Sequence, residues 1–172
     1  VARITPAGGF QNIYNIANDN RGAYEALVTS TGDYVVAEQG NNPWGSQGVL
    51  ASVTRDGSSR VPLYSFPTGA FPTGLAIDGN GDYIVTEPGT APPALARFHD
   101  TGAGYTRQVI YSAADWRPDR VIVDSDGSFV VVETSVASIG GGRLVRIAPA
   151  TPPQMVATLK TAIDTSLAVT GP

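Results

Sequence analysis

The sequence predicts an all-β protein made of repeated four-stranded antiparallel units, and three observations support this. Short apolar segments alternate with Gly, Pro, Asn and Asp, and none has the spacing of an amphipathic helix. Glycine occurs 20 times and proline 13 times in 172 residues, which is typical of a fold with many turns. A two-strand pattern ends at Glu38, Glu87 and Glu133, which are 49 and 46 residues apart. Repeats of this length are typical of propellers and solenoids, and the lack of helical spacing favours a β-propeller.

The first two strands of each unit form an inner hairpin. It reads EALVTSTGDYVVAE at 25–38, GLAIDGNGDYIVTE at 74–87 and DRVIVDSDGSFVVVE at 119–133. In each copy a short polar residue opens the turn, and a glycine stands where a positive φ is needed to rejoin the strands. We therefore expect three equivalent hairpins.

Two more strands follow each hairpin and complete a four-stranded propeller blade. The third strands are predicted at 49–54, 95–99 and 143–148, and the fourth at 61–66, 106–111 and 154–159.

Partial units are expected at both ends of the chain. Residues 2–7 resemble the third strand at 146–150, residues 10–16 read as a fourth strand, and Leu167-Ala168-Val169 resembles a first strand. The predicted organisation is the outer strands of a blade, three whole blades and the first strand of a further blade, at 1–20, 21–66, 67–115, 116–162 and 163–172. Closed rings usually hold about four to eight blades, so we expect the ring to need a second chain or the remainder of a longer polypeptide.

The inner hairpins resemble a known group of proteins. Residues 72–87, beginning Pro-Thr-Gly-Leu-Ala-Ile-Asp, and residues 118–133, beginning Pro-Asp-Arg-Val-Ile-Val-Asp, are similar to NHL-type repeats. The same signature is shared by the streptogramin lyases and the gluconolactonase/paraoxonase-like propellers, and the resemblance covers nearly the whole chain. It implies a propeller fold. The streptogramin lyase resemblance implies a histidine base and a metal-binding glutamate, but the sequence has one histidine, His99, and it lacks the early Glu-Gly-Pro motif expected of gluconolactonases.

Composition excludes several classes of function. The net charge is -4, with acidic and basic residues mixed along the chain, so we expect no nucleic-acid partner. The absence of cysteine excludes disulfides, thiol catalysis and thiolate metal sites. No run of about 18 apolar residues is present, so no membrane span is expected. A chain that begins at Val1 and has a single lysine, Lys160, suggests a secreted or cell-surface protein whose signal has been removed.

The repeated glutamates allow two interpretations. If Glu38, Glu87 and Glu133 turn inward around one axis, their carboxylates could hold calcium or magnesium, which prefer several oxygen ligands. Alternatively, a carboxylate repeated once per blade is structural and accepts backbone N–H bonds that tie one blade to the next. The structural interpretation is the favoured one.

Two loops suggest ligand binding. Asn41, Asn42 and Trp44 lie in a long loop, and Trp116 opens on the same face, so aromatic and amide groups could grip a carbohydrate. The alternative is that both tryptophans pack against neighbouring blades.

We therefore expect an extracellular NHL-like propeller that binds or assembles through its loop face and open blade edges, as an oligomer or with another chain. The alternatives are a metal-dependent lyase or hydrolase of the streptogramin lyase type and a carbohydrate-binding propeller. No catalytic residue is predicted, since His99 stands alone beside Asp100 at the end of a third strand.

Overall fold

The computed structural model describes residues 2–4, 6–14, 21–40, 47–137, 141–148 and 152–159. Within these ranges the chain forms strands β1 to β14 and no helix, which confirms the all-β prediction. The described residues accordingly include no helix that could cross a membrane.

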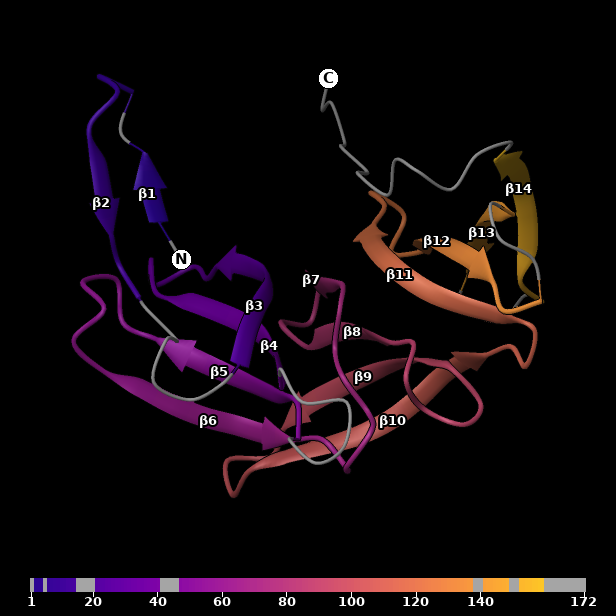
Figure 1. Cartoon of the computed structure of the whole chain (residues 1–172), viewed down its shortest axis with the longest axis horizontal. Helices are drawn as coiled ribbons and strands as arrows, with labels where there is room; N and C mark the ends of the chain where they lie inside the picture. The colour runs from indigo at the N-terminus through magenta and orange to yellow at the C-terminus, as the bar shows by residue number, and fades with distance from the viewer. Residues whose placement is uncertain are drawn as a thin grey trace. The chain divides into compact units, whose positions relative to one another are not determined.

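The strands form three four-stranded sheets and one two-stranded sheet, all antiparallel (Figure 1). In each sheet the strands are neighbours in chain order, which is the meander of a propeller blade. The first sheet contains β3 (Arg21–Val28), β4 (Tyr34–Gly40), β5 (Val49–Val53) and β6 (Arg60–Ser65). The second contains β7 (Leu75–Ile77), β8 (Tyr83–Glu87), β9 (Ala94–Asp100) and β10 (Tyr105–Ser112). The third contains β11 (Trp116–Val123), β12 (Phe129–Ser135), β13 (Gly142–Ile147) and β14 (Gln154–Leu159). The two-stranded sheet contains β1 (Ala2–Ile4) and β2 (Phe10–Asn12).

The three inner hairpins have the same turn, as their sequences predict. The residue that opens each turn and the residue that closes it bond through their backbones, with N···O distances of 2.8 Å for Thr29–Asp33, 3.0 Å for Asp78–Asp82 and 2.8 Å for Asp124–Ser128. The turn glycines Gly32, Gly81 and Gly127 have φ angles of 87°, 86° and 81°. A residue with a side chain rarely adopts these angles, so glycine fixes each turn.

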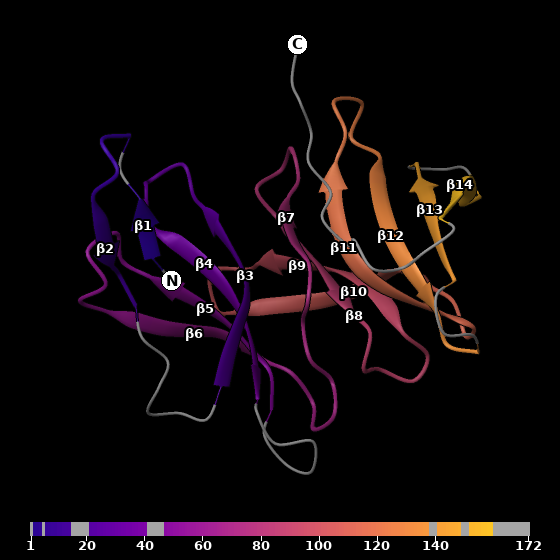
Figure 2. The same ribbon diagram turned by 45° about the horizontal axis from the view of Figure 1, so that its top comes forward.

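The chain divides into two compact units, residues 1–72 and 73–172. In the second unit the second and third sheets pack face to face, and their first strands, β7 and β11, lie beside each other (Figure 2). Both sheets contribute to one buried apolar cluster, which contains Ala76, Ile84, Leu95, Val121, Phe129, Val131, Val145 and Ile147. This is the packing expected between adjacent propeller blades.

The first unit contains the first sheet and the β1–β2 sheet. The centre of β4 and β5 is fully buried, with Val35, Val36 and Leu50 at 0% exposure. Ile13, directly after β2, is 6% exposed, and its carbonyl oxygen would lie 1.8 Å from a Cβ at Gly57 in the β5–β6 turn. The β1–β2 sheet is therefore held to the first sheet at this turn.

Candidate functional site

Each of the three predicted glutamates is completely buried and paired with an arginine. Glu38, Glu87 and Glu133 are all 0% exposed. In the first sheet Arg60 on β6 binds Glu38 with both Nε and Nη2, and the Nε–Oε1 distance is 2.9 Å. In the second sheet Arg107 on β10 binds Glu87 in the same way, also at 2.9 Å from Nε to Oε1. A two-point bond of this kind satisfies both the charge and the geometry of a buried carboxylate.

These two arginines come from the fourth strand and reach a glutamate on the second. By the strand register, the third-strand residues on the same face include Ala51 in the first sheet and Ala96 in the second. Both alanines are 0% exposed, and their small side chains leave room for the guanidinium to cross. In the third sheet the position of these alanines is occupied by Val145. The arginine of this sheet, Arg143, lies on the third strand β13, directly opposite Glu133.

Glu133 is bound less completely than the other two glutamates. Arg143 Nε donates to its Oε2 at 2.6 Å, while Arg143 Nη2 donates to the Tyr111 hydroxyl at 3.0 Å. Within the described residues Glu133 Oε1 has no hydrogen-bond partner. Tyr111 belongs to β10, and burial together with the Glu133 charge raises its pKa. The contacts of Tyr111 with Arg143 and Glu133 therefore link the second sheet to the third.

The pairing bears on the predicted metal site. Glu87 and Glu133 each have their own arginine in their own sheet, and no group of three or more His, Cys, Asp or Glu in the described part of the chain could hold a metal ion. The prediction of a blade-to-blade tie has a counterpart in the Tyr111–Glu133 contact of 3.5 Å, although the partners found are side chains and not backbone amides. Sequence reasoning missed the arginines. The signal was the similar spacing of Arg60 and Arg107 from their glutamates, 22 and 20 residues.

A second feature missed from the sequence is a bulge in, or just before, the first strand of each four-stranded sheet, close to the glutamate. The register shifts between Ala23 and Glu25 in β3 and between Pro118 and Arg120 in β11, so Tyr24 and Asp119 are extra residues. Just before β7 the backbone hydrogen bonds show the same pattern. The Thr73 N–H donates to the Thr86 carbonyl at 3.1 Å, and the Thr86 N–H donates to the Gly74 carbonyl at 3.0 Å, so Thr73 is the extra residue. Bulges of this kind re-aim a side chain and often lie beside functional sites.

Asp119 is the ionisable member of this series. Its half-buried position raises the pKa of its carboxyl group, and a hydrogen bond from Thr134 with the charges of Arg120 and Arg117 acts in the opposite direction. Arg120 Nη1 donates to the carbonyls of Thr73 and Asp119, at 3.0 Å each. Asp119 is therefore a carboxyl group on the edge strand of its sheet with an environment that perturbs its titration.

The predicted aromatic ligand contacts are only partly within the described residues. Trp116 begins β11, and the Arg143 guanidinium carbon lies 4.2 Å from its ring centroid, a cation–π contact. One face of this ring is therefore covered by the same arginine that binds Glu133. Asn41, Asn42 and Trp44 lie outside the described residues.

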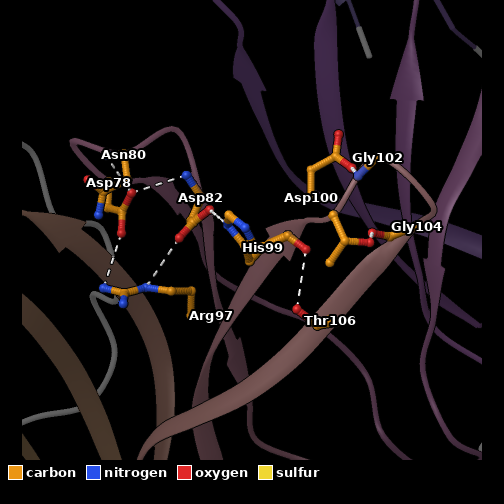
Figure 3. Close-up of polar contacts among 10 residues, drawn as sticks. Asp78, Asn80, Asp82, Arg97, His99, Asp100, Gly102, Gly104 and Thr106 are labelled. Carbon is orange, nitrogen blue, oxygen red and sulfur yellow. Dashed lines mark hydrogen bonds and ion pairs between the residues drawn. The ribbon is translucent and has the colours of Figure 1, made fainter.

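His99 belongs to a polar cluster at the turn of the second inner hairpin (Figure 3). Its Nδ1 lies 2.7 Å from Asp82 Oδ1, while Arg97 reaches Asp78 at 3.1 Å and Asp82 at 3.7 Å. The third sheet repeats this arrangement without a histidine, since Arg146 pairs with Asp124 at 3.0 Å and Asp126 at 2.7 Å. We use the term turn clamp for a third-strand arginine, Arg97 or Arg146, that is bound to carboxylates of the inner-hairpin turn. His99 adds to one turn clamp, and its side chain is 62% exposed.

A polar groove of about 490 Å³ lies beside the first inner hairpin. Hydrogen bonds from Ser58 and Thr54 lower the pKa of Asp56 to about 2, and the Arg55 N–H donates to Asp33 at 3.0 Å. The groove is lined by Gln11, Asp33, Thr54, Arg55, Asp56 and Ser58. Both of its carboxylates are thus already bonded within the turns.

Comparison with known proteins identifies the fold. Neither a protein-family model nor a curated protein matches this sequence. A solved structure described as a putative gluconolactonase matches with a TM-score of 0.64 and 15% identity, over 94% of this chain and 56% of that one. A catalytically inactive virginiamycin B lyase from Staphylococcus aureus, with quinupristin, matches with a TM-score of 0.64 and 18% identity, over 95% and 49%. Regucalcin from Agrobacterium tumefaciens, described as a calcium-binding protein, matches with a TM-score of 0.62 and 13% identity, over 90% and 51%.

The chain spans about half the length of each of these proteins. At these identities the likeness concerns the fold, and it confirms the resemblance seen in the inner hairpins. The chain has the β-propeller fold that gluconolactonase, streptogramin lyase and regucalcin share, with three complete four-stranded blades and a partial one in its described residues.

Proposed function

We propose that this chain is a propeller unit that serves as a binding or assembly scaffold through its loop face and its open sheet edges. The observation that carries the proposal is the β1–β2 sheet. It has two strands where the other sheets have four, and it leaves Ile4 and Phe10 73% exposed. A two-stranded sheet is marginal in water unless further strands or another element cover it.

The buried ion pairs support the same proposal. The glutamates that a metal-dependent enzyme could use are bound by Arg60, Arg107 and Arg143, which leaves them a structural role. We also propose a secreted or cell-surface location, which is supported by the single lysine and the low content of charged residues, 15%.

Native mass spectrometry of protein isolated from its source tests the proposal. The expected result is a mass above that of this chain, either as a longer polypeptide or as a complex with another chain. A stable monomer of 17.8 kDa with protected β1 and β2 amides would contradict the proposal, because no partner would be needed.

A metal-dependent hydrolase or lyase is a second candidate, and Asp119 is the observation that favours it. The carboxyl group stands at a bulge on an edge strand, where burial raises its pKa. The neighbouring Arg117 and Arg120 disfavour a cation, and the described residues offer no complete ligand set, so further oxygen ligands would have to come from other blades.

Calorimetric titration with calcium and with magnesium separates the two candidates. The enzyme candidate requires binding that is lost in Asp119→Asn and retained in Asp126→Asn, a control on an exposed turn. The scaffold proposal expects no binding that depends on Asp119.

A further inference from the structure

The turn of the second inner hairpin contains an asparagine followed by a glycine, Asn80 and Gly81, and this dipeptide occurs once in the sequence. Both residues are exposed, and a Cβ placed on Gly81 would have no atom within 4 Å. The backbone N–H of Asn80 donates to Asp78 Oδ1 at 2.9 Å, whereas its carboxamide has no hydrogen-bond partner among the described residues (Figure 3). An exposed carboxamide therefore lies next to a backbone nitrogen that no side chain shields.

The other two inner-hairpin turns carry different residues at this position. Thr31 and Asp126 are equivalent to Asn80, since each directly precedes the turn glycine with positive φ. Asp126 Oδ2 accepts a hydrogen bond from Arg146 Nη2 at 2.7 Å, and its Oδ1 accepts one from the Ser128 N–H at 3.0 Å. A turn of this type therefore accommodates a carboxylate at the position of Asn80.

Asn80 and Gly81 supply the groups that react in spontaneous deamidation. The Gly81 backbone nitrogen attacks Asn80 Cγ, the bond from Cγ to the carboxamide nitrogen breaks, and ammonia leaves with the proton that the Gly81 nitrogen gives up. Water then opens the cyclic imide. Addition of water at Cγ gives aspartate, and addition at the backbone carbonyl carbon of residue 80 gives isoaspartate, in which the chain runs through Cγ. Glycine favours ring closure because it has no Cβ to obstruct the approach.

The folded turn opposes this attack. The Gly81 N–H donates to the Asp78 carbonyl at 3.0 Å, and the Asp78 N–H donates to the Asp82 carbonyl at 3.0 Å. Arg97 binds the side chains of both aspartates, at 3.1 Å for Asp78 and 3.7 Å for Asp82. The Gly81 nitrogen must leave its hydrogen bond before it can reach Asn80 Cγ, so the reaction requires local opening of a turn that the turn clamp restrains.

We propose that Asn80 is a site of spontaneous deamidation and that the turn clamp of Arg97 sets its rate. The aspartate product keeps the backbone and adds a carboxylate where the third turn has Asp126. The isoaspartate product lengthens the backbone between residues 80 and 81, so the second inner hairpin loses the turn bond from Gly81 to Asp78. This inference concerns a chemical modification and is independent of the scaffold proposal.

Peptide mapping by mass spectrometry measures the modification after incubation of the whole chain in mildly alkaline buffer. We expect the mass increase of an amide-to-acid conversion at Asn80, with the isoaspartate fraction identified by labelling with an isoaspartyl methyltransferase. The rate should be at least about tenfold lower than in a free peptide of residues 72–87, because the reaction waits for the turn to open. Asn80→Gln, whose longer side chain cannot form the same ring, is the control and should show no conversion at residue 80.

Arg97→Gln tests the role of the turn clamp. It should raise the rate in the folded chain at least about threefold, because the turn opens more often. Arg97→Lys keeps the positive charge and should give an intermediate rate, whereas Arg146→Gln removes the turn clamp of the third turn and should leave the rate unchanged. Gly74→Ala, which perturbs the packing of the second blade outside this turn, separates local opening from global unfolding and should also leave the rate unchanged.

Three results would overturn the inference. The first is an unmodified Asn80 in the folded chain after many half-lives of the free peptide, and the second is an equal rate in the folded chain and the peptide. The third is a rate in Arg97→Gln that equals that of the unmodified chain. Equal acceleration in Gly74→Ala and Arg97→Gln would assign the reaction to global unfolding and would overturn the role of the turn clamp.

Discussion

The three buried glutamates differ in how their charge is balanced. Glu38 and Glu87 each bind both Nε and Nη2 of one guanidinium, whereas Glu133 shares Arg143 with the Tyr111 hydroxyl and keeps one oxygen unbonded among the described residues. A buried ion pair contributes little net stability, but removal of one partner leaves an uncompensated charge in the interior. Each ion pair therefore fixes the arrangement of its two side chains more than it adds to overall stability.

Replacement of one glutamate should therefore destabilise the protein. Glu87→Gln is expected to lower the free energy of unfolding by about 2–4 kcal/mol, because it leaves Arg107 without its charge partner. Urea denaturation measures the change. The double variant Glu87→Leu with Arg107→Met should recover part of the loss. An unchanged free energy of unfolding combined with lost calcium binding would instead support a metal role for Glu87.

Gly74 offers a prediction about close packing between the second and third blades. A Cβ here would lie 2.7 Å from Thr86 Oγ1 and 2.9 Å from both the Arg120 Cα and the Asp119 carbonyl oxygen. Gly74→Ala should cost about 1–3 kcal/mol of stability, as overpacking does. Gly79→Ala, with nothing within 4 Å of its Cβ, is the control and should change stability by less than about 0.5 kcal/mol. Equal stability of the two variants, measured by thermal and urea unfolding, would show that the blades can separate at Gly74.

At the scale of the element, the inner hairpin combines three devices. Its turn is fixed by a glycine with positive φ, its turn carboxylates are held by a third-strand arginine in two sheets, and its first strand carries one extra residue near the glutamate. The second-sheet turn clamp is the more buried, since Asp78 and Asp82 side chains are 6% and 10% exposed, against 37% and 57% for Asp124 and Asp126.

The two turn clamps should consequently differ in energy. Arg97→Gln is expected to cost about 2 kcal/mol, because it leaves two mostly buried carboxylates without their arginine. Arg146→Gln, at an exposed clamp, should cost less than about 1 kcal/mol. Urea unfolding of the two variants provides the comparison, and a larger loss for Arg146→Gln would contradict the assignment of energy to burial.

Sequence patterns were sufficient for the hairpins and strand order, because the glycine turns and apolar segments are local signals. The glutamate positions followed from the same repeats. The arginine partners did not follow from the repeats, since Arg60 and Arg107 reach their glutamates from a strand two places away. In the third sheet the arginine, Arg143, lies on the third strand and not on the fourth, and Val145 stands where the other two sheets have an alanine. The bulge residues were also missed, because an extra residue becomes visible only when the register of two paired strands is known.

At the scale of the whole molecule, protection from solvent is uneven. The second and third strands of the four-stranded sheets together hold most of the buried residues, whereas all three residues of β2 are exposed. Local opening is easiest where few apolar contacts are buried. The β1–β2 sheet is thus the part of the described chain that we expect to open most easily.

Hydrogen exchange of the chain alone should show this difference. Amides of β2 are expected to exchange at least about a hundredfold faster than those of β8 and β12, because only two strands protect them. Mass spectrometry with peptide resolution measures the rates. A dilution series is the control, and equal protection of β2 and β8 at every concentration would mean that the β1–β2 sheet is already covered.

The extra residue in each first strand has a consequence for engineering. Tyr24, Thr73 and Asp119 are an aromatic, a hydroxyl and a carboxyl group at one equivalent place, where the surrounding ladder tolerates different chemistry. A combinatorial library that varies only these three positions would change one residue in each four-stranded sheet while the turns and buried ion pairs stay constant. New specificities could then be selected from a common frame.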